Sequence, residues 1–397
     1  MKTLVLQKDL TWLGAIDKDL RVFDIIMRTE FGTTYNAYLL RGSEKNVLFE
    51  TVKAGFADGY FKALTSLISP EKIDYLVISH TEPDHSGSFE RLLDLNPNLT
   101  VVGTLAAMGF LKHIVNRDFK ALPVKDNDTL SLGDKTLRFF ALPNLHWPDT
   151  LFTYVEEEGL LVTCDAFGAH FAHEGVLRST VENEAAYLGA VQYYFDGILS
   201  PFKRPFVQNA LDRVKGLSLR MILTGHGPVL DTGIEDILTR YQAWCALPEK
   251  AKKLVVIPYV SAYGYTRALS EQIERGILSA LDADVRRYDM VEADEKQVLS
   301  DLERADAILF GTPTIVGDAL KPIWRLTSAM HAPVHGGKRA TAFGSYGWSG
   351  EGVPNLLARL KQLRLKVTDE GLRVRFKPTQ ADLAAAFEFG KAFGGTI

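Results

Sequence analysis

Cysteine is almost absent from this sequence: Cys164 and Cys245 are the only two among 397 residues. They cannot form a disulfide framework, and no Cys-x-x-Cys pair is available for zinc, rubredoxin-type iron or an iron–sulfur cluster. Any bound metal must therefore use histidine and carboxylate ligands. We interpret Cys164, which lies beside a candidate ligand, as a buried structural thiol.

Long apolar runs and an excess of positive charge are also missing. No apolar stretch approaches the roughly 20 residues that span a bilayer, and the first nine residues do not resemble a signal peptide. We therefore expect a cytoplasmic protein with no membrane segment. The formal net charge is -4 with both signs interspersed, which leaves no basic face for binding nucleic acid.

Composition and length predict a globular protein of two domains. Hydrophobic residues make up 46% and charged residues 24% of the chain, which is ordinary globular usage. Residues 10–16, 22–27, 33–40 and 46–51 alternate like strands of an antiparallel sheet, and helices alternate with short strands from about residue 56. A proline and lysine cluster near residue 250 marks a boundary. We expect domains at 1–250 and 251–397.

The second domain shows a regular alternation of strands and helices. Its predicted strands are 254–260, 285–289, 307–311, 340–344 and either 366–368 or 372–376. Its predicted helices are 266–281, 295–305, 320–330, 353–363 and 380–393. Five such units predict a doubly wound parallel sheet.

Four possible metal ligands occur within six residues after the strand at 75–78. They are His80, Glu82, Asp84 and His85, in the segment Ser79-His80-Thr81-Glu82-Pro83-Asp84-His85-Ser86-Gly87. In an extended chain, His80, Glu82 and Asp84 project to one side and His85 to another, so two neighbouring metals can be served. Ser86 or Ser88 is placed to cap a following helix.

Three further candidates follow apolar strands in the same domain: His146, Asp165 and His226. A single histidine in a loop is usually only solvated or hydrogen bonded. The combination with His-x-Glu-x-Asp-His and Leu-x-Gly-His-Gly-Pro is far more specific.

These motifs resemble the metallo-β-lactamase superfamily and, within it, the flavodiiron proteins. Hydrolases of that superfamily usually read His-x-His-x-Asp-His, whereas this chain has Glu82 at the second ligand position. A carboxylate is harder than imidazole and suits iron better. The resemblance implies that His80, Glu82 and His146 bind one iron, that Asp84, His85 and His226 bind another, and that Asp165 bridges them. It also implies an N-terminal αββα metallo-β-lactamase-like sandwich followed by a flavodoxin-like domain.

Some residues near these motifs stay open to interpretation. His170 is either close to the metal ligands or an ordinary loop histidine. Trp147 can wall the metal pocket, and Tyr193 and Tyr194 can approach it, but we favour core packing for all three.

Three loops at predicted strand ends of the second domain resemble the FMN-binding loops of flavodoxins. The first, Ser261, Ala262, Tyr263, Gly264, Tyr265 and Thr266, enters a helix and resembles a phosphate loop with tyrosine at the central hydroxyl position. The others contain Thr312, Pro313, Thr314, Ile315 and Gly317, and Ser345, Tyr346, Gly347, Trp348 and Gly350. They resemble loops that hold an isoalloxazine ring. FAD is not favoured because no Gly-x-Gly-x-x-Gly loop is present.

The resemblance implies an oxidoreductase that passes electrons through FMN to two iron ions and reduces O2 to water or NO to nitrous oxide. The electrons are expected from a separate donor: rubredoxin, a nicotinamide-linked reductase or a deazaflavin. The sequence leaves the gas open, and we favour O2. We expect a head-to-tail homodimer or a dimer of dimers. Two alternatives are a zinc hydrolase with an appended flavodoxin domain and an FMN-only redox carrier or sensor.

Overall fold

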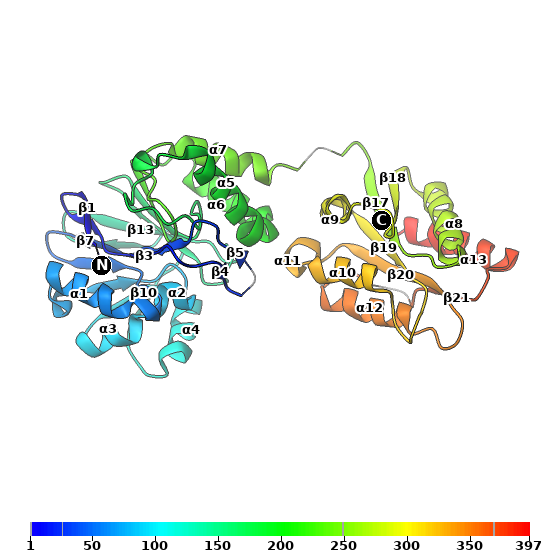
Figure 1. Cartoon of the computed structure of the whole chain (residues 1–397), viewed down its shortest axis with the longest axis horizontal. Helices are drawn as coiled ribbons and strands as arrows, with labels where there is room; N and C mark the ends of the chain where they lie inside the picture. The colour runs from blue at the N-terminus through cyan, green and yellow to red at the C-terminus, as the bar shows by residue number, and fades with distance from the viewer. Residues whose placement is uncertain (1, 26, 248–249, 368–369) are drawn as a thin grey trace. The chain divides into compact units, whose positions relative to one another are not determined.

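The computed structural model describes residues 2–25, 27–247, 250–367 and 370–397. The chain divides into two compact units, Met1–Ala246 and Leu247–Ile397 (Figure 1). Among the described residues, no helix combines the length and apolar character that a membrane crossing requires.

Two sheets form the N-terminal unit. The first has the order β1-β2-β7-β8-β9-β10-β11 and the second β12-β13-β14-β15-β16. The first sheet is antiparallel from β1 to β8 and parallel from β8 to β11, and the second is antiparallel except for the parallel pair β15 and β16. Their strands are β1 (Leu4–Gln7), β2 (Leu10–Trp12), β7 (Tyr38–Arg41), β8 (Asn46–Phe49), β9 (Tyr75–Val77), β10 (Thr100–Gly103), β11 (Lys120–Pro123), β12 (Thr129–Ser131), β13 (Thr136–Ala141), β14 (Leu151–Val155), β15 (Leu160–Cys164) and β16 (Met221–Thr224).

Helices cover the outer faces of these sheets, with α1, α3 and α4 on one side and α5, α6 and α7 on the other (Figure 1). They are α1 (Ala57–Leu67), α2 (Pro83–Ser86), α3 (Phe89–Leu95), α4 (Leu105–Val115), α5 (Glu184–Tyr194), α6 (Gln208–Val214) and α7 (Ile234–Cys245). Short helical turns occupy Ala54–Phe56, Pro70–Lys72, Arg178–Thr180, Phe195–Leu199, Ser200–Phe202 and Lys203–Val207. Buried side chains such as Trp12, Phe49 and Phe139 fill the space between the sheets. The predicted αββα sandwich is confirmed.

Two local predictions in this unit are wrong. The expected strand at 22–27 is a hairpin of β4 (Val22–Phe23) and β5 (Met27–Arg28), with Asp24 and Ile25 at positive φ. The remaining strands, β3 (Ala15–Asp17) and β6 (Thr33–Tyr35), pair with each other. The ligand motif itself contains a short helix, α2, that begins at Pro83, because proline fits the first position of a helix, and the predicted helix, α3, begins directly after Ser88.

Ser88 occupies the N-cap position of α3 but its side chain makes no capping hydrogen bond, and Ser86 lies inside α2, so the predicted capping is wrong. The Ser86 hydroxyl donates to the Thr81 carbonyl and the Ser88 hydroxyl to the Val52 carbonyl.

The C-terminal unit is a parallel five-stranded sheet with the order β18-β17-β19-β20-β21, which confirms the doubly wound prediction. Its strands are β17 (Lys253–Tyr259), β18 (Ala283–Asp289), β19 (Ala307–Gly311), β20 (Arg339–Tyr346) and β21 (Leu372–Arg375). Its helices are α8 (Tyr265–Ala280), α9 (Glu295–Arg304), α10 (Lys321–Ala329), α11 (Ala332–His335), α12 (Gly352–Gln362) and α13 (Gln380–Gly394). Of the two candidates for the last strand, 372–376 is the correct one; Lys366 forms only an isolated bridge with Arg339, and residue 368 lies outside the described residues.

Helices α8 and α13 pack unusually close together on one face of this sheet. A Cβ atom on Gly276 would collide with the Phe387 carbonyl, and one on Gly390 with the Ile273 carbonyl. The opposite face is covered by α9, α10 and α12 through Leu302, Ile323 and Leu356. Both faces of the sheet are thus buried, so only the strand ends and the two edge strands β18 and β21 are free to carry a site.

Candidate functional site

The seven candidate metal ligands lie in the segments that follow four strands of the N-terminal unit, and two of them, Asp84 and His85, belong to the short helix α2. The segment from Ser79 to Ser86 follows β9, His146 follows β13, Asp165 directly follows β15, and His226 follows β16. The structure brings all seven together.

Asp165 is the centre of the cluster because its two oxygens face different histidines. Its Oδ2 lies 2.7 Å from His146 Nε2 and 3.3 Å from His80 Nε2. Its Oδ1 lies 3.0 Å from His85 Nε2 and 3.5 Å from His226 Nε2. A carboxylate in this position can join two metal ions.

Each side of Asp165 also has one further carboxylate. Glu82 Oε2 is 3.3 Å from His80 Nε2 and 3.6 Å from His146 Nε2. Asp84 Oδ2 is 3.1 Å from His226 Nε2 and 3.5 Å from His85 Nε2. Three groups of ligand atoms converge among the described residues: His80 with Glu82, His146 and Asp165; Asp84 with His85 and His226; and His80 and His85 with Cys164 and Asp165. The first two lie on opposite sides of Asp165.

The helical turn of α2 explains why Asp84 and His85 belong to one group. The expectation that an extended chain turns His85 away from Asp84 is wrong, because both residues lie in the helical segment Pro83–Ser86. In a helical turn, consecutive side chains diverge by only about 100°, so both reach the same side of Asp165 while the extended residues His80 and Glu82 serve the other.

Burial and charge make this cluster suited to cations. Nε2 of His80, Nε2 of His85 and both oxygens of Asp84 are buried. They lie close to other candidate ligand atoms, but their orientations form no hydrogen bond among the described residues. Burial alone would raise the pKa of Asp165, but the neighbouring His80 and His85 hold it well below its usual value. Such atoms fit metal coordination, because buried polar groups otherwise need hydrogen-bond partners.

Hydrogen bonds on the outer side of the imidazoles orient two of the histidines. The Nδ1 atom of His226 lies 2.6 Å from the Thr34 carbonyl, and the Nδ1 atom of His80 lies 3.5 Å from the Cys164 thiol. When Nδ1 donates, Nε2 keeps a lone pair that faces Asp165, which is the usual arrangement for metal-binding histidine. Cys164 is buried as predicted, but it also contacts a ligand.

Two buried carboxylates hold the ligand loop by its backbone. Glu50 Oε1 accepts from the Ser79 N–H at 2.8 Å, and Asp149 Oδ2 accepts from the Thr81 N–H at 2.9 Å. At the other end, the N–H and hydroxyl of Thr51 both donate to the His85 carbonyl, at 2.8 and 2.6 Å. These protein contacts fix the loop between β9 and α2 independently of any ion.

Only one side of the cluster is open to solvent. Glu82 and His146 are 13% and 14% exposed, whereas the other five side chains are 7% or less. Asp24 hydrogen bonds to Glu82 there, and burial together with this contact raises the pKa of Asp24 to about 6. No motif marked Asp24, because it lies in the short β4–β5 hairpin. A small molecule can reach the cluster from the Glu82 side.

The residues whose roles the sequence did not decide lie in different environments. His170 is buried, with its Nδ1 2.9 Å from the Thr33 hydroxyl, and burial lowers its pKa to about 3. Tyr194 is buried against His170, and Trp147 lies edge-on to His80 at 5.6 Å. Tyr193 is about half exposed and lines a neighbouring cavity of about 780 Å³ with His170, so core packing is the wrong interpretation of it.

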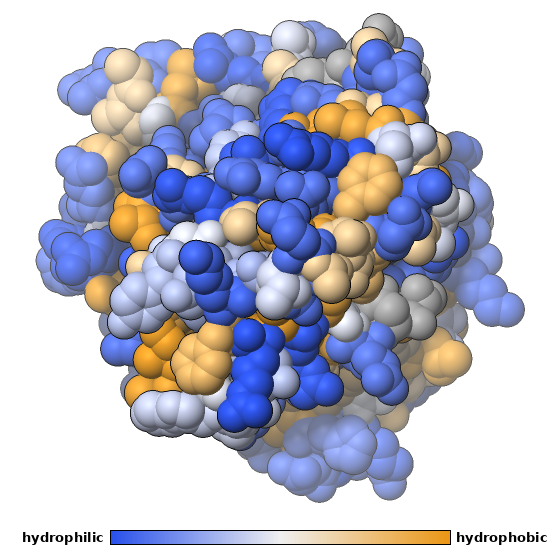
Figure 2. Space-filling view, turned by 90° about the vertical axis from the view of Figure 1, so that its right-hand side faces the viewer, coloured by the Kyte–Doolittle hydropathy of each residue, from blue (hydrophilic) through white to orange (hydrophobic). Residues whose placement is uncertain are grey.

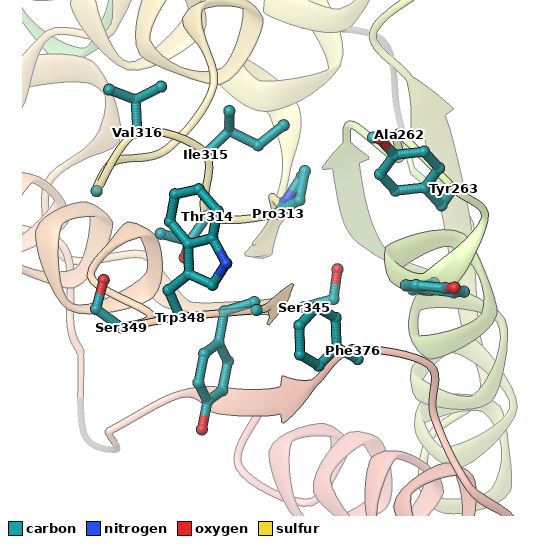
Figure 3. A pocket seen from close by; sticks show the side chains of 14 residues that line it. Ala262, Tyr263, Pro313, Thr314, Ile315, Val316, Ser345, Trp348, Ser349 and Phe376 are labelled. Atoms are coloured by element: carbon teal, nitrogen blue, oxygen red, sulfur yellow. The ribbon is translucent and has the colours of Figure 1, made fainter.

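The C-terminal unit contains a cavity of about 300 Å³ at the ends of β17, β19 and β20. Its lining includes residues from all three predicted flavin loops: Ala262, Tyr263, Tyr265, Pro313, Thr314, Ile315, Gly317, Ser345, Tyr346, Gly347 and Trp348. Figure 3 shows Trp348 and Tyr263 on opposite sides of this cavity, with Ser345 and Phe376 between them. Aromatic and aliphatic walls at strand ends suit a flat ring system.

The first turn of α8 fits a phosphate group. Gly264 has φ +79° and caps α8 without a side-chain hydrogen bond, and a Cβ atom there would meet open space. Arg267 N–H donates to the Ser261 hydroxyl, and the first N–H groups of a helix have no partner within the helix, so a first turn of this kind can bind an anion.

Five predicted flavin residues do not line the cavity. The Ser261 hydroxyl accepts from Arg267 N–H, and the Thr266 and Ser345 hydroxyls lie 3.0 Å apart. Thr312 is buried, and its hydroxyl accepts from Leu320 N–H. Gly350, at φ +81°, leaves room for the Tyr346 ring, and Gly264 shapes the turn.

The structure adds Val316, Ser349 and Phe376 to the lining. Phe376 follows the edge strand β21 at φ +56° and packs over Gly347. The only sequence signal for it was the end of the last predicted strand.

Comparison with known proteins agrees with both units. Residues 33–227 match the family described as ODP family beta lactamase, and residues 257–390 match flavodoxin. The flavo-diiron protein FprA2 of Clostridium acetobutylicum is 41% identical over 406 residues, covering 100% of both chains. The type A flavoprotein fprA of Rhodobacter capsulatus is 39% identical over 96% of this chain and 88% of its own length.

Two solved structures are similar over nearly the whole chain. The rubredoxin oxygen:oxidoreductase of Desulfovibrio gigas has a TM-score of 0.64 at 26% identity and covers 100% of this chain and 98% of its own. The flavodiiron protein of Giardia intestinalis has a TM-score of 0.63 at 26% identity over 99% and 96%. The chain therefore belongs to the flavodiiron proteins, oxidoreductases that carry FMN and a diiron centre.

Proposed function

We propose that this protein reduces O2, NO or both, with electrons that pass from a separate donor through FMN to two iron ions. The observation that carries the proposal is the position of Asp165, whose two oxygens face two matched groups of ligands. Two observations count against the zinc hydrolase alternative: the family membership, and the presence of Glu82 in the ligand set.

We assign His80, Glu82 and His146 to one iron and Asp84, His85 and His226 to the other, with Asp165 shared. The two groups of converging ligand atoms support this assignment. When bound, FMN supplies single electrons and the iron pair supplies the reducing power and Lewis acidity that O2 or NO reduction needs.

The chain itself positions and shields this chemistry. The Glu50 and Asp149 carboxylates hold the ligand loop in place. Buried walls on the Asp84 side keep bulk water away, so a small gas approaches past Glu82 and His146, the two most exposed ligands.

We further propose that metal binding belongs to a domain at 1–250 and FMN binding to a domain at 251–397. The phosphate would lie at the first turn of α8, and the isoalloxazine ring between the loops around Thr314 and Tyr346. The FMN-only alternative would leave seven converging ligands without a purpose.

We propose O2 as the preferred gas and a head-to-tail dimer as the working unit. The similar Desulfovibrio gigas protein is named for rubredoxin and oxygen, which favours an iron–sulfur carrier over a nicotinamide-linked reductase or a deazaflavin as the donor.

The test compares anaerobic turnover of O2 and NO by the iron-loaded protein with one artificial electron donor. Asp165→Ala should lose gas reduction by at least about 100-fold, because loss of one ligand disorganises both metal positions, while FMN binding and reducibility stay unchanged. Asp94→Ala, which removes an exposed carboxylate of α3, is the matched control. Near-native turnover by Asp165→Ala would contradict the proposed function.

A further inference from the structure

The N-terminal unit contains a cavity of about 780 Å³ whose described lining residues include none of the seven candidate metal ligands. It lies between α5 and residues 21–22 and 28–31, and it is called the α5 cavity below. We propose that it binds a small organic anion with an apolar body, which restrains the β4–β5 hairpin beside the metal cluster. The binding stands apart from the proposed function, whereas its effect on gas reduction rests on that function.

Small residues on one face of α5 create the space. Ala186, Gly189 and Ala190 line the cavity at helical spacing, and Tyr193 follows one turn later. A Cβ atom on Gly189 would have no neighbour within 4 Å outside its own stretch of helix. Small-molecule sites occupy roughly 300–1,000 Å³, so the volume suits an organic ligand and exceeds what a diatomic gas needs.

The walls of the α5 cavity provide apolar contacts for such a ligand. Val22 and Phe31 come from the other wall, and Phe31 packs against the buried Phe171 with ring centroids 5.1 Å apart. Hydrophobic areas also occur on open surface, as Figure 2 shows for one end of the molecule, where they are scattered among hydrophilic ones. The cavity differs because a molecule inside it is contacted from two sides and loses more water-exposed apolar area.

Two arginines at the hairpin favour an anionic head group. Val22 pairs with Arg28 in the register of the hairpin, and the Thr29 N–H donates to the Arg21 carbonyl at 3.0 Å, so Arg21 and Arg28 lie at the same end of it. Both side chains line the cavity, together with one described acidic residue, Glu30. Two positive charges and one negative charge favour a carboxylate over an ammonium group.

The guanidinium of Arg21 is held in position by its own segment. Its Nη1 atom donates to the Lys18 and Leu20 carbonyls at 2.7 and 2.9 Å. The N–H groups on its other two nitrogens match the planar geometry of a carboxylate. A ligand would therefore pair with a side chain that has little freedom left to lose.

His170 forms a buried part of the lining. It is only 4% exposed, and its Nε2 has no hydrogen-bond partner among the described residues. Its Nδ1 lies 2.9 Å from the Thr33 hydroxyl, which is also 3.3 Å from Nδ1 of the candidate ligand His226. The rings of His170 and His226 are 5.1 Å apart between centroids. One side chain thus contacts both the cavity and a candidate metal ligand.

The β4–β5 hairpin connects the cavity to the open side of the cluster. Phe23 of the hairpin lies against His170 at 4.3 Å between ring centroids, and Asp24 hydrogen bonds to Glu82. A ligand that contacts both Arg28 and α5 stabilises the arrangement in which Asp24 covers Glu82. Since a small gas approaches past Glu82 in the proposed function, we expect an occupied cavity to slow gas reduction.

The first experiment measures binding to the full-length holoprotein by isothermal titration calorimetry. Three probes separate the two halves of the ligand: hydrocinnamate has an apolar body and a carboxylate, phenethylamine has the same body with an ammonium group, and acetate has the carboxylate alone. Hydrocinnamate should bind at least about tenfold more tightly than either of the others, because each of them lacks one of the two contacts. Equal binding of all three, or no binding of hydrocinnamate, would overturn the site.

A variant that fills the cavity tests the location. Gly189→Trp places an indole in the open space beside α5 and should weaken hydrocinnamate binding at least about tenfold, because it occupies the apolar volume. Gly109→Trp is the matched control, since Gly109 is exposed inside α4 and a Cβ atom there also has no neighbour within 4 Å. Replacing a helical glycine raises helix propensity at both positions. Equal affinities of the two variants would contradict the location.

Arg28→Gln tests the head group separately. An exposed arginine contributes modestly, so the affinity for hydrocinnamate should fall about threefold, while that for phenethylamine should not fall. Arg275→Gln, which removes an exposed arginine of α8, should leave both affinities unchanged. An unchanged affinity of Arg28→Gln for hydrocinnamate would overturn the preference for an anion.

Gas reduction separates the failure of this inference from the failure of the proposed function. Saturating hydrocinnamate should slow O2 reduction by the unmodified protein at least about twofold and should affect Gly189→Trp less. Binding without any reduction of O2 or NO would contradict the proposed function and leave the site intact, whereas native reduction that hydrocinnamate does not slow would overturn the restraint on the hairpin. A changed sedimentation coefficient of Gly189→Trp, without hydrocinnamate binding to the unmodified protein, would assign the cavity to an interface between chains and overturn the site.

Discussion

At the scale of single residues, the choice of Glu82 distinguishes this centre from a zinc hydrolase. Glu82 completes a ligand group with His80 and His146 on one side of Asp165. Its counterpart on the other side, Asp84, contributes the same kind of oxygen ligand. In the proposed assignment, each metal position therefore combines two imidazoles with a carboxylate and a share of Asp165, a set that suits iron.

We predict that Glu82→His shifts metal selectivity toward zinc. The variant would offer three imidazoles on one side, a softer set that binds zinc well. After expression in medium with equal iron and zinc, the zinc-to-iron ratio measured by mass spectrometry should rise severalfold. Glu90→His, on the surface of α3, should keep the original ratio. An unchanged iron content in Glu82→His would show that this position does not set metal choice.

The sequence identified the candidate ligands that the structure brings together, because they lie in short motifs, but not the residues that support them. His80, Glu82, Asp84 and His85 are adjacent in the chain and have the chemistry of metal ligands. Glu50, Asp149, Thr34 and Asp24 meet them only after folding, from segments with no distinctive pattern. Phe376 was missed for the same reason. The local spacing of residues in the sequence does not predict contacts between distant segments.

At the scale of elements, the short helix α11 contains a buried histidine whose protonation opposes folding. Nδ1 of His335 lies 3.2 Å from the His331 amide nitrogen and 3.0 Å from the His331 carbonyl oxygen, and its Nε2 is buried with no partner among the described residues. Burial and the nearby charge of Lys338 lower the pKa of His335 to about 4. His335 is therefore neutral in the folded protein at pH 5, whereas an unfolded histidine is protonated there.

We predict that His335→Gln weakens the acid sensitivity of the C-terminal unit. Between pH 6.5 and about pH 4 the unfolded chain binds the extra proton, so stability falls as pH falls, by up to about 3 kcal/mol. Urea unfolding of the full chain, followed by FMN release at pH 7 and pH 5, measures this loss. The variant should lose less stability than the unmodified protein, and His113→Gln, an exposed site on α4, should behave like the unmodified protein. Equal losses in all three would contradict the prediction.

Regular periodicity made the elements of the C-terminal unit predictable, whereas short irregular elements were not. The helix predicted at 266–281 is α8, Tyr265–Ala280, because its apolar residues repeat every turn. The strand predicted at 22–27 is a hairpin, since Val22 and Met27 sit on opposite arms of a turn with positive φ. Hydrophobic alternation does not report where a chain reverses direction.

At the scale of the whole molecule, the metal ligands and the flavin cavity belong to different compact units. The ligands lie within Met1–Ala246 and the cavity within Leu247–Ile397. In the proposed function, every electron that reaches the metals therefore crosses from one unit to another, within a chain or between chains.

We predict that this transfer runs between two chains of a dimer. Asp165→Ala lacks a working metal centre, and Gly264→Trp blocks the turn that would hold the phosphate, so each variant alone should be inactive. After subunit exchange, each mixed dimer contains one intact metal centre and one intact flavin site on opposite chains, and should regain about half of the native activity per dimer. Oxygen consumption measures the recovery. Zero activity after exchange has been verified by mass spectrometry would show that transfer stays within one chain.

The hydrogen bonds that hold the ligand loop also bear on how the protein meets a shortage of iron. Glu50, Asp149 and Thr51 fix the loop through protein contacts alone, unlike zinc fingers, which unfold without their metal. Chains made without iron would thus persist as folded protein and could be activated when iron returns, without new synthesis. The amount of working enzyme would then follow the supply of iron and not the rate of translation.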